Sequence, residues 1–276
     1  VQTDMLGLRS TSWIDARGRP VFELGLNGVM ISALEDEQTA KGYLASAALN
    51  KDDVIVQWSL VKAPLPLPDP REARFLRVSL SRSPLSDERQ RCHSAAADFV
   101  CEIDATRGAA RSAGSADADL RPSATVQSRD PMIRSLAKTI AGGSGTVPEK
   151  IGAVLAWLEQ NISKEPVDTF SALDVLDARR GECQGHSYLY AALMRSLGVP
   201  TRVVNGLVYS AEHGGFLYHT WAESLVEGSW RAVDPTFNQT RADATHIALV
   251  RGESLAELVP LVDWVGNTRI RVLEAR

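Results

Sequence analysis

Cys183 stands at the start of a stretch of the chain in which apolar residues recur every four positions. Leu189, Leu193 and Leu197 would lie on one face of a helix, and Gly198 would end that helix as a left-handed cap. The sequence therefore predicts a buried helix that begins at or just after Cys183. Unpaired N–H groups and the helix dipole favour negative charge at such a position, and this favours the nucleophilic thiolate over the thiol.

A predicted hairpin follows the helix, and the length of its loop sets which residues face each other. We take Glu227 and Gly228 as a two-residue loop. Counting back from this loop puts Trp221 opposite Asp234. His219 lies two residues before Trp221 on the same face, so it becomes a diagonal neighbour of Asp234, within side-chain reach at roughly 7 Å between Cα atoms. The hairpin thus predicts that a carboxylate can orient an imidazole.

Together these residues supply a thiol, an imidazole and a carboxylate, the three parts of a nucleophilic acyl-transfer site. Each residue has a plainer interpretation when it is taken alone. Cys183 could be a structural cysteine at a helix start, His219 a satisfied core histidine, and Asp234 a turn former before Pro235. Their joint occurrence on a helix start and a hairpin favours a functional site.

The chain divides by pattern near residue 125. Residues 1–125 are expected to form a β-rich N-terminal domain, and we see no catalytic constellation in them. Residues 126–276 are expected to form the domain that carries the site. In the first part we expect strands at 10–14, 21–26, 54–60, 74–80 and 99–103, a helix at 36–44, an extended stretch through Pro64, Pro66, Pro68 and Pro70, and a loop at 107–123. In the second part we expect helices at 131–140 and 147–162 and strands at 201–209 and 216–226.

Composition excludes some classes of protein. The net charge of −4 gives no electrostatic footprint for nucleic acid or an anionic membrane. No apolar run approaches the roughly 20 residues of a membrane span. The sequence opens at Val1 without a signal peptide or an initiator Met, so we expect a processed or trimmed form from which any export signal has been removed.

The three cysteines leave two arrangements open. Cys92 and Cys101 are nine positions apart and either form a disulfide or stay unpaired. A disulfide would indicate an oxidising compartment and would leave Cys183 as a free, reactive thiol. We therefore expect an exported protein of the periplasm or cell envelope, with the cytoplasm as the alternative.

Four linked motifs resemble the transglutaminase-like core, and most closely that of bacterial transglutaminase-like domain proteins. The resemblance covers residues 128–252 and rests on these segments in order: Gly181-Glu182-Cys183, Leu197-Gly198-Val199-Pro200-Thr201-Arg202-Val203-Val204, Tyr218-His219-Thr220-Trp221-Ala222-Glu223 and Val233-Asp234-Pro235-Thr236. The segments Phe237-Asn238-Gln239 and Ala242-Asp243-Ala244-Thr245-His246-Ile247 also resemble that bacterial group. Many of those relatives carry an acidic residue two positions after the cysteine, where this chain has Gly185.

The resemblance implies an α+β fold with a papain-like core, in which the helix bearing the cysteine packs on an antiparallel sheet, preceded by a mostly antiparallel β domain. It implies that Cys183 is the nucleophile, that His219 is the general base and later the acid, and that Asp234 orients His219. The reaction would form a thioacyl-enzyme from an amide. Attack by water would make the protein a peptidase or amidase, and attack by an amine would make it a protein-glutamine transferase. The partner would be a peptide or protein with a backbone amide or a glutamine side chain.

Two other classes of protein remain as alternatives. Cys183 and His186, with His213, His219 and His246, could form a metal site, although structural zinc prefers closer, paired ligand spacing. The chain could also be a non-catalytic binding or scaffold module with the same fold. We expect no cofactor and no metal, and no calcium loop of the Asp-x-Asp-x-Asp-Gly type is present.

Overall fold

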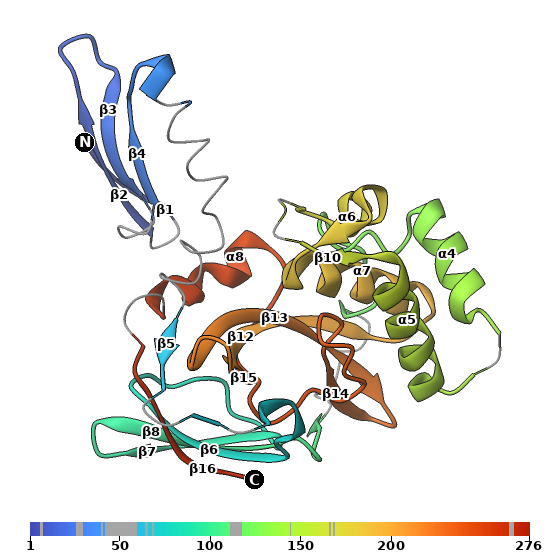
Figure 1. Cartoon of the computed structure of the whole chain (residues 1–276). Coiled ribbons are helices and arrows are strands. Elements are labelled where there is room, and N and C mark those ends of the chain that lie inside the picture. Colours follow the sequence, from blue (N-terminus) through green and yellow to red (C-terminus); the bar gives the residue numbers. More distant parts are fainter. Residues whose placement is uncertain are drawn as a thin grey trace.

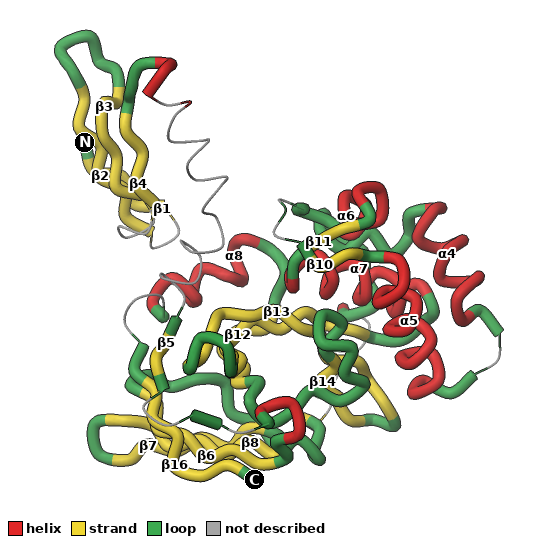
Figure 2. The backbone as a smooth tube through the Cα atoms, viewed as in Figure 1, coloured by secondary structure: helices red, strands yellow, loops and turns green. Residues whose placement is uncertain are grey.

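The computed structural model describes most of the chain and shows an α+β fold with antiparallel sheets (Figures 1 and 2). The described residues are 1–5, 8–25, 30–39, 41, 60–63, 66–67, 69–110, 118–143, 145–165, 167, 169–264 and 268–276. Within these residues, no helix is both long enough and apolar enough to cross a membrane.

The elements fall into four sheets and two groups of helices. Four strands form an antiparallel sheet in the order β1 (Gln2–Met5), β2 (Leu8–Ile14), β3 (Pro20–Gly25) and β4 (Met30–Ala33). A second four-stranded sheet has the order β16 (Ile270–Ala275), β6 (Phe75–Leu80), β8 (Asp98–Asp104) and β7 (Gln90–Ala95). The six-stranded sheet has the order β15 (Ile247–Arg251), β12 (Thr201–Ser210), β13 (Gly215–Val226), β14 (Ser229–Val233) and β9 (Ala109–Ala110), with β5 (Val61–Lys62) paired to β13. Two short parallel strands are β10 (Ser163–Lys164) and β11 (Arg180–Gly181).

The first group of helices comprises α4 (Pro131–Ala141), α5 (Val147–Asn161), α6 (Ala172–Ala178) and α7 (Cys183–Ser196). The second group contains the short helices η2 (Pro70–Glu72), α8 (Leu255–Leu258) and η3 (Val259–Asp263).

The six-stranded sheet lies between the first group of helices and the β6–β8 sheet (Figure 1). On the helix side, α4 to α7 bury their apolar faces against sheet residues that include Ala222 and Val233. On the other side, Leu207 and Phe216 of the six-stranded sheet share a core with Val78 of β6. Helix α7 is at the centre of the helical layer, because every residue from Gly185 to Arg195 is buried. The helix that bears Cys183 is therefore held by packing along almost its whole length.

The starts of the helices follow from their capping residues. Asp130 accepts a hydrogen bond from the N–H of Met132 at the start of α4. Thr146 and Glu149 form a capping box at the start of α5. Both helices also carry a proline in the first turn, where the missing N–H costs nothing. These signals explain why both helices begin where the sequence predicts.

Most of the predicted elements are confirmed, with two corrections. The hairpin of β2 and β3, the strands β6, β8, β12 and β13, and the helices α4 and α5 lie at the predicted positions. The loop predicted at 107–123 contains β9, because Ala109 and Ala110 pair with β14. Pro70 was predicted to continue an extended stretch, but it begins η2, because proline's fixed φ also suits the first turn of a helix. The predicted strand at 54–60 lies outside the described residues except for Leu60, and the predicted helix at 36–44 is described only at 36–39 and 41.

Strand pairing joins the two parts of the chain on either side of residue 125. Before that residue, β5 pairs with β13 and β9 pairs with β14. Conversely, β16, which lies at the end of the chain, pairs with β6, which precedes residue 125. The buried guanidinium of Arg89 donates hydrogen bonds to the carbonyl oxygens of Ala242, Asp243 and His246. A division into 1–125 and 126–276 stays a prediction, and these contacts cross it.

Gly206 of β12 lies where neighbouring strands come very close. It faces His219 of β13 in the strand register. A Cβ atom at this position would be 2.0 Å from the carbonyl oxygen of Ile247 and 2.7 Å from the ring of Trp221. The absence of a side chain therefore lets β15 approach β12, and this approach brings the residues before Ile247 towards His219.

We predict that Gly206→Ala destabilises the protein by about 1–3 kcal/mol, because the added methyl group must displace backbone atoms of β15. Urea unfolding would measure the change in the free energy of unfolding. As a control, Gly152→Ala in α5 adds a methyl group with nothing within 4 Å, so it should stabilise the protein by about 0.5–1 kcal/mol. A Gly206→Ala variant as stable as the wild type would contradict this account of the strand packing.

Candidate active site

Cys183 is the first residue of α7, as the sequence predicts. Its side chain is partly exposed, and it is the one free cysteine among the described residues. Glu182 at the N-cap makes no side-chain cap hydrogen bond with the helix. The first N–H groups of α7 therefore keep their capacity to stabilise a negative charge near the sulfur.

The hairpin of β13 and β14 has the predicted register. Val226 pairs with Ser229, and Glu227 and Gly228 between them both have positive φ, as a type I′ turn requires. The Nε2 atom of His219 lies 2.7 Å from Oδ2 of Asp234. The predicted diagonal contact between the imidazole and the carboxylate is thus present.

Cys183 lies on the other side of the His219 ring and interacts with it through charge and through a side-chain hydrogen bond. Because Nε2 faces Asp234, Nδ1 is the ring nitrogen left for the sulfur. Burial alone would lower the pKa of His219, but the negative charge of Asp234 and then that of Cys183 outweigh burial and raise the pKa to about 10. The structure thus brings all three predicted residues together, in an environment that favours the protonated form of His219.

Asp234 is fully buried and accepts four hydrogen bonds. Its Oδ1 accepts from the N–H groups of Thr236 and Phe237, at 2.7 and 3.1 Å. Its Oδ2 accepts from His219 and from a second histidine, His246, at 2.7 and 2.8 Å. Burial raises the pKa of Asp234, but the charge and hydrogen bonds of His219, followed by those of His246, lower it well below its usual range.

The contact of His246 with Asp234 was not predicted from the sequence. His246 had appeared only as a candidate metal ligand and within a segment that resembles the bacterial group. Asp243, three residues earlier, contacts the other ring nitrogen of His246. The three-residue spacing of Asp243 and His246 could have suggested that these two side chains interact. No predicted hairpin joins this loop to Asp234, so counting from a turn could not have placed His246 beside Asp234.

The other histidines of the alternative metal site lie elsewhere. His186 bonds the carbonyl oxygen of Glu182 through Nδ1. His213 bonds the hydroxyl group of Ser210. The predicted cluster of Cys183, His186 and His213 with the remaining histidines is therefore not assembled.

A different group of atoms comes close enough together for a metal ion. One ligand atom each of His219, Asp234 and His246 lie within 4.8 Å of one another. Direct hydrogen bonds of 2.7 and 2.8 Å already join these atoms, so protons occupy the positions that a metal would need. We therefore treat the three residues as a hydrogen-bonded network and not as metal ligands.

Gly185 marks the position where bacterial relatives carry an acidic residue. A Cβ atom at Gly185 would lie 2.7 Å from both the hydroxyl group of Thr169 and a methyl group of Val175. In this chain the side chains of Thr169 and Val175 fill the space that a side chain at residue 185 would need.

A cleft of about 670 Å³ opens beside His219. Its lining includes Tyr218, Phe237 and Arg71. The ring of Phe237 stacks on His219 with centroids 5.0 Å apart and remains 40% exposed. An apolar wall therefore covers one face of the imidazole and borders the space where a substrate could lie.

Glu223, the last residue of the motif that contains His219, forms ion pairs with two arginines. Its carboxylate binds Arg202, which faces it across β12 and β13, at 2.7 Å and Arg251 of β15 at 2.9 Å. Glu223 is 3% exposed. Burial raises its pKa, but the charges of Arg251 and Arg202 outweigh burial and lower it. This buried cluster of charges ties together β12, β13 and β15, of which β13 carries His219.

The fold and the site define a class of protein: an α+β structure in which a cysteine at a helix start faces a histidine and an aspartate on a hairpin. Residues 134–235 match the transglutaminase-like superfamily. Cys183, His219 and Asp234 all lie within the matched residues.

Comparison with individual proteins gives more distant similarities. An uncharacterised protein of Mycobacterium leprae is 29% identical over 118 residues, which are 40% of this chain and 42% of that protein. The chain thus spans less than half the length of this relative. A candidate cysteine protease from Cytophaga hutchinsonii has a similar structure, with a TM-score of 0.51, 17% identity, and coverage of 74% of this chain and 89% of that one. The periplasmic domain of TgpA from Pseudomonas aeruginosa gives a TM-score of 0.44 and 15% identity, covering 66% of this chain and 88% of that one. The first of these two structures shows a shared fold.

We predict that Glu223→Gln destabilises the protein by about 3–5 kcal/mol at pH 7, because it removes the ion-pair partner of the partly buried Arg202, while Arg251 keeps only Asp87. The folded state lowers the pKa of Glu223, so its stabilisation is present above the unfolded pKa of about 4.3 and is lost as the pH falls. The difference between wild type and variant should therefore shrink below about pH 4.

Urea unfolding at several pH values would measure this difference. The exposed pair of Glu159 and Lys164 offers a matched control, for which Glu159→Gln should change the free energy by no more than about 1 kcal/mol. A difference between wild type and Glu223→Gln that stays constant from pH 7 to pH 3 would show that the ion pair does not act as described.

Proposed function

We propose that this protein catalyses thiol-dependent acyl transfer from amide bonds, with Cys183 as the nucleophile, His219 as the base and acid, and Asp234 as the group that orients His219. One observation carries the proposal: the His219 ring is held between Asp234 at 2.7 Å and Cys183 at the start of α7. The match of the surrounding residues to the transglutaminase-like superfamily supports it.

The arrangement accounts for each proton in such a reaction. The hydrogen bond to Asp234 keeps the proton on Nε2 of His219, so Nδ1 can take the thiol proton of Cys183. The thiolate then attacks the amide carbonyl, and the N–H of Cys183 at the helix start can donate to the oxyanion. His219 returns the proton to the leaving amine, and a thioester to Cys183 remains. A second nucleophile, activated by His219, releases the acyl group.

We propose water as the second nucleophile, which makes the protein a cysteine peptidase or amidase that acts on a peptide or protein. Water is always present, whereas transfer to an amine needs a dedicated site for that amine. The cleft of about 670 Å³ beside His219 is open to solvent, which supports access of water to the site. The assays below would distinguish this peptidase activity from transfer of an acyl group from a protein glutamine to an amine.

The disulfide between Cys92 and Cys101 supports an exported protein. It joins β7 and β8, where the two cysteines face each other directly. Disulfides persist mainly in oxidising compartments. We therefore propose the periplasm or the cell envelope as the location.

We predict that iodoacetamide alkylates Cys183 rapidly near pH 6, and that His219→Ala lowers this rate at least about tenfold. The reason is that the raised pKa of His219 keeps the ring protonated at this pH, and an imidazolium stabilises the thiolate. Mass spectrometry of the labelled protein would measure the rate. Equal labelling of the two proteins, with reaction only above about pH 8 as for an ordinary thiol, would instead favour the non-catalytic binding module.

A direct activity assay would follow cleavage of unfolded casein and, in parallel, incorporation of a fluorescent amine into casein. Cleavage without incorporation would support the peptidase, and incorporation without cleavage would support the transferase. Cys183→Ala should abolish either activity, with a loss of at least about 1,000-fold. If Cys183→Ala kept the activity of the wild type, Cys183 could not be the nucleophile.

We predict that a chelator such as EDTA leaves the activity unchanged within about twofold. The proposed mechanism relies on proton transfer by His219, whereas a metal enzyme would rely on a bound ion. Metal analysis of the purified protein would accompany the assay. Stoichiometric zinc, together with loss of activity on chelation, would instead support a metal site at His219, Asp234 and His246.

A further inference from the structure

Two histidines share a single oxygen atom of Asp234. Nε2 of His219 lies 2.7 Å and Nε2 of His246 lies 2.8 Å from Oδ2 of this carboxylate. An ionised carboxylate can only accept hydrogen bonds, so both histidines must donate through Nε2–H. The orientation of Asp234 is thus set by His246 as well as by the backbone N–H groups that bind Oδ1.

The other ring nitrogen of His246 faces only acceptors. Nδ1 lies 3.2 Å from the carbonyl oxygen of Asp243 and 3.2 Å from Oδ1 of its carboxylate. A nitrogen lone pair in this position would be repelled by both oxygens, whereas an N–H would satisfy either one. Since His246 is fully buried, water cannot make up for a missing hydrogen bond. Both ring nitrogens of His246 are therefore expected to carry protons.

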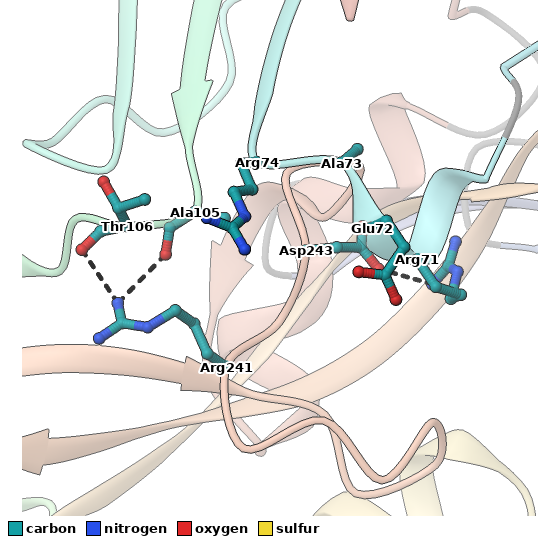
Figure 3. Close-up of a pocket in the computed structure, with 8 residues that line it drawn as sticks. All are labelled: Arg71, Glu72, Ala73, Arg74, Ala105, Thr106, Arg241 and Asp243. Atoms are coloured by element: carbon teal, nitrogen blue, oxygen red, sulfur yellow. Dashed lines mark hydrogen bonds and ion pairs between the residues drawn. The ribbon is translucent and has the colours of Figure 1, made fainter. Parts of the chain in front are cut away.

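Asp243 is itself fixed from a distant part of the chain. Its Oδ2 lies 3.1 Å from a guanidinium nitrogen of Arg71 in η2 and 2.9 Å from the side-chain nitrogen of Gln239. Figure 3 shows this ion pair at the edge of a pocket of about 380 Å³ that Arg74 and Arg241 also line. The guanidinium of Arg71 also lies 4.4 Å from the ring centre of Phe237, which stacks on His219.

We propose that His246 is a second positioning residue of the site: as a doubly protonated ring it holds the Asp234 carboxylate that orients His219, and Asp243, anchored by Arg71, holds His246. Negative and positive charges then alternate along this series of contacts. The series runs from the Cys183 thiolate through His219, Asp234, His246 and Asp243 to Arg71. The proposal rests on the proposed function, because it assigns a role within that reaction.

The described charged groups around His246 act in both directions on its protonation. Asp234 after β14 and Asp243 before β15 favour the charged ring. The protonated His219 of β13, whose ring centre is 5.7 Å away, and the buried Arg89, which donates to the carbonyl oxygen of His246, oppose it. The other neighbours are aromatic: Trp221 lies 5.2 Å and Phe237 lies 6.1 Å from the His246 ring. Among the described residues, the groups that contact the ring nitrogens directly are the two carboxylates and a backbone carbonyl, all of which are acceptors.

The first test measures the protonation of His246 in the wild-type protein. The chain has five histidines, so selective ¹⁵N-histidine labelling gives a simple spectrum of ring nitrogens. The signals of His246 would be identified by their absence in His246→Gln. We expect both nitrogens in the N–H form between pH 6 and 8. A lone-pair signal for Nδ1 of His246 in this range would overturn the proposal.

The second test uses alkylation of Cys183 by iodoacetamide at pH 6.5 as the readout. His246→Ala removes the donor to Asp234, and we expect the rate to fall about 10- to 100-fold, as when a catalytic group is misplaced by about 1 Å. His246→Gln places an N–H group near the position of Nε2, so it should restore the rate to within about threefold of the wild type. Asp243→Asn keeps an oxygen but removes the charge, and it should give an intermediate rate.

The controls separate this inference from the proposed function. His93→Ala, on the exposed surface of β7, should leave the rate unchanged. A rate in His246→Ala equal to the wild type would overturn the positioning role, as would a folded His246→Gln that is as slow as His246→Ala. If His219→Ala itself labels at the wild-type rate, the proposed function fails, and the ¹⁵N spectrum still decides the protonation of His246.

Discussion

A carboxylate buried completely in a protein must have its charge compensated, and the site is arranged around the compensation of Asp234. Two backbone N–H groups come from the turn after β14, one imidazole comes from β13, and another comes from the loop before β15. These pieces are distant along the chain. The turn, the hairpin and the close approach of β15 to β12 must all form before Asp234 has its full set of partners, so the geometry of the site depends on the whole six-stranded sheet.

Local sequence rules account for the part of the site that lies on neighbouring elements. The length of the loop at Glu227 and Gly228 is sufficient to place His219 beside Asp234, because side chains alternate along a strand and pairing is counted from the turn. The apolar spacing after Cys183 likewise predicts α7 and its start. Periodicity also predicts the helices α4 and α5, whose capping residues are visible in the sequence.

Contacts between distant segments could not be predicted in this way. Nothing in the spacing of Asp243 and His246 reveals that β15 pairs with β12, and nothing near Arg71 indicates that its side chain reaches Asp243. Both depend on tertiary packing of segments that are not neighbours in the sequence: Leu207 and Ile247 are 40 positions apart, and Arg71 and Asp243 are 172 positions apart. The same holds for β5 and β9, strands of two residues each, which are too short to show any periodicity and exist because β13 and β14 offer them an edge.

Arg89 holds the loop before β15 by binding its backbone. All three of the acceptors of its buried guanidinium are carbonyl oxygens, at Ala242, Asp243 and His246. A carbonyl oxygen is present whatever side chain a residue carries. A single change at Arg89 would therefore remove three attachments of the loop backbone at once, whereas a substitution within the loop leaves these three acceptors in place. The backbone position of the loop thus depends on one distant side chain, while the side chains of residues 242–246 are themselves buried and constrained by packing.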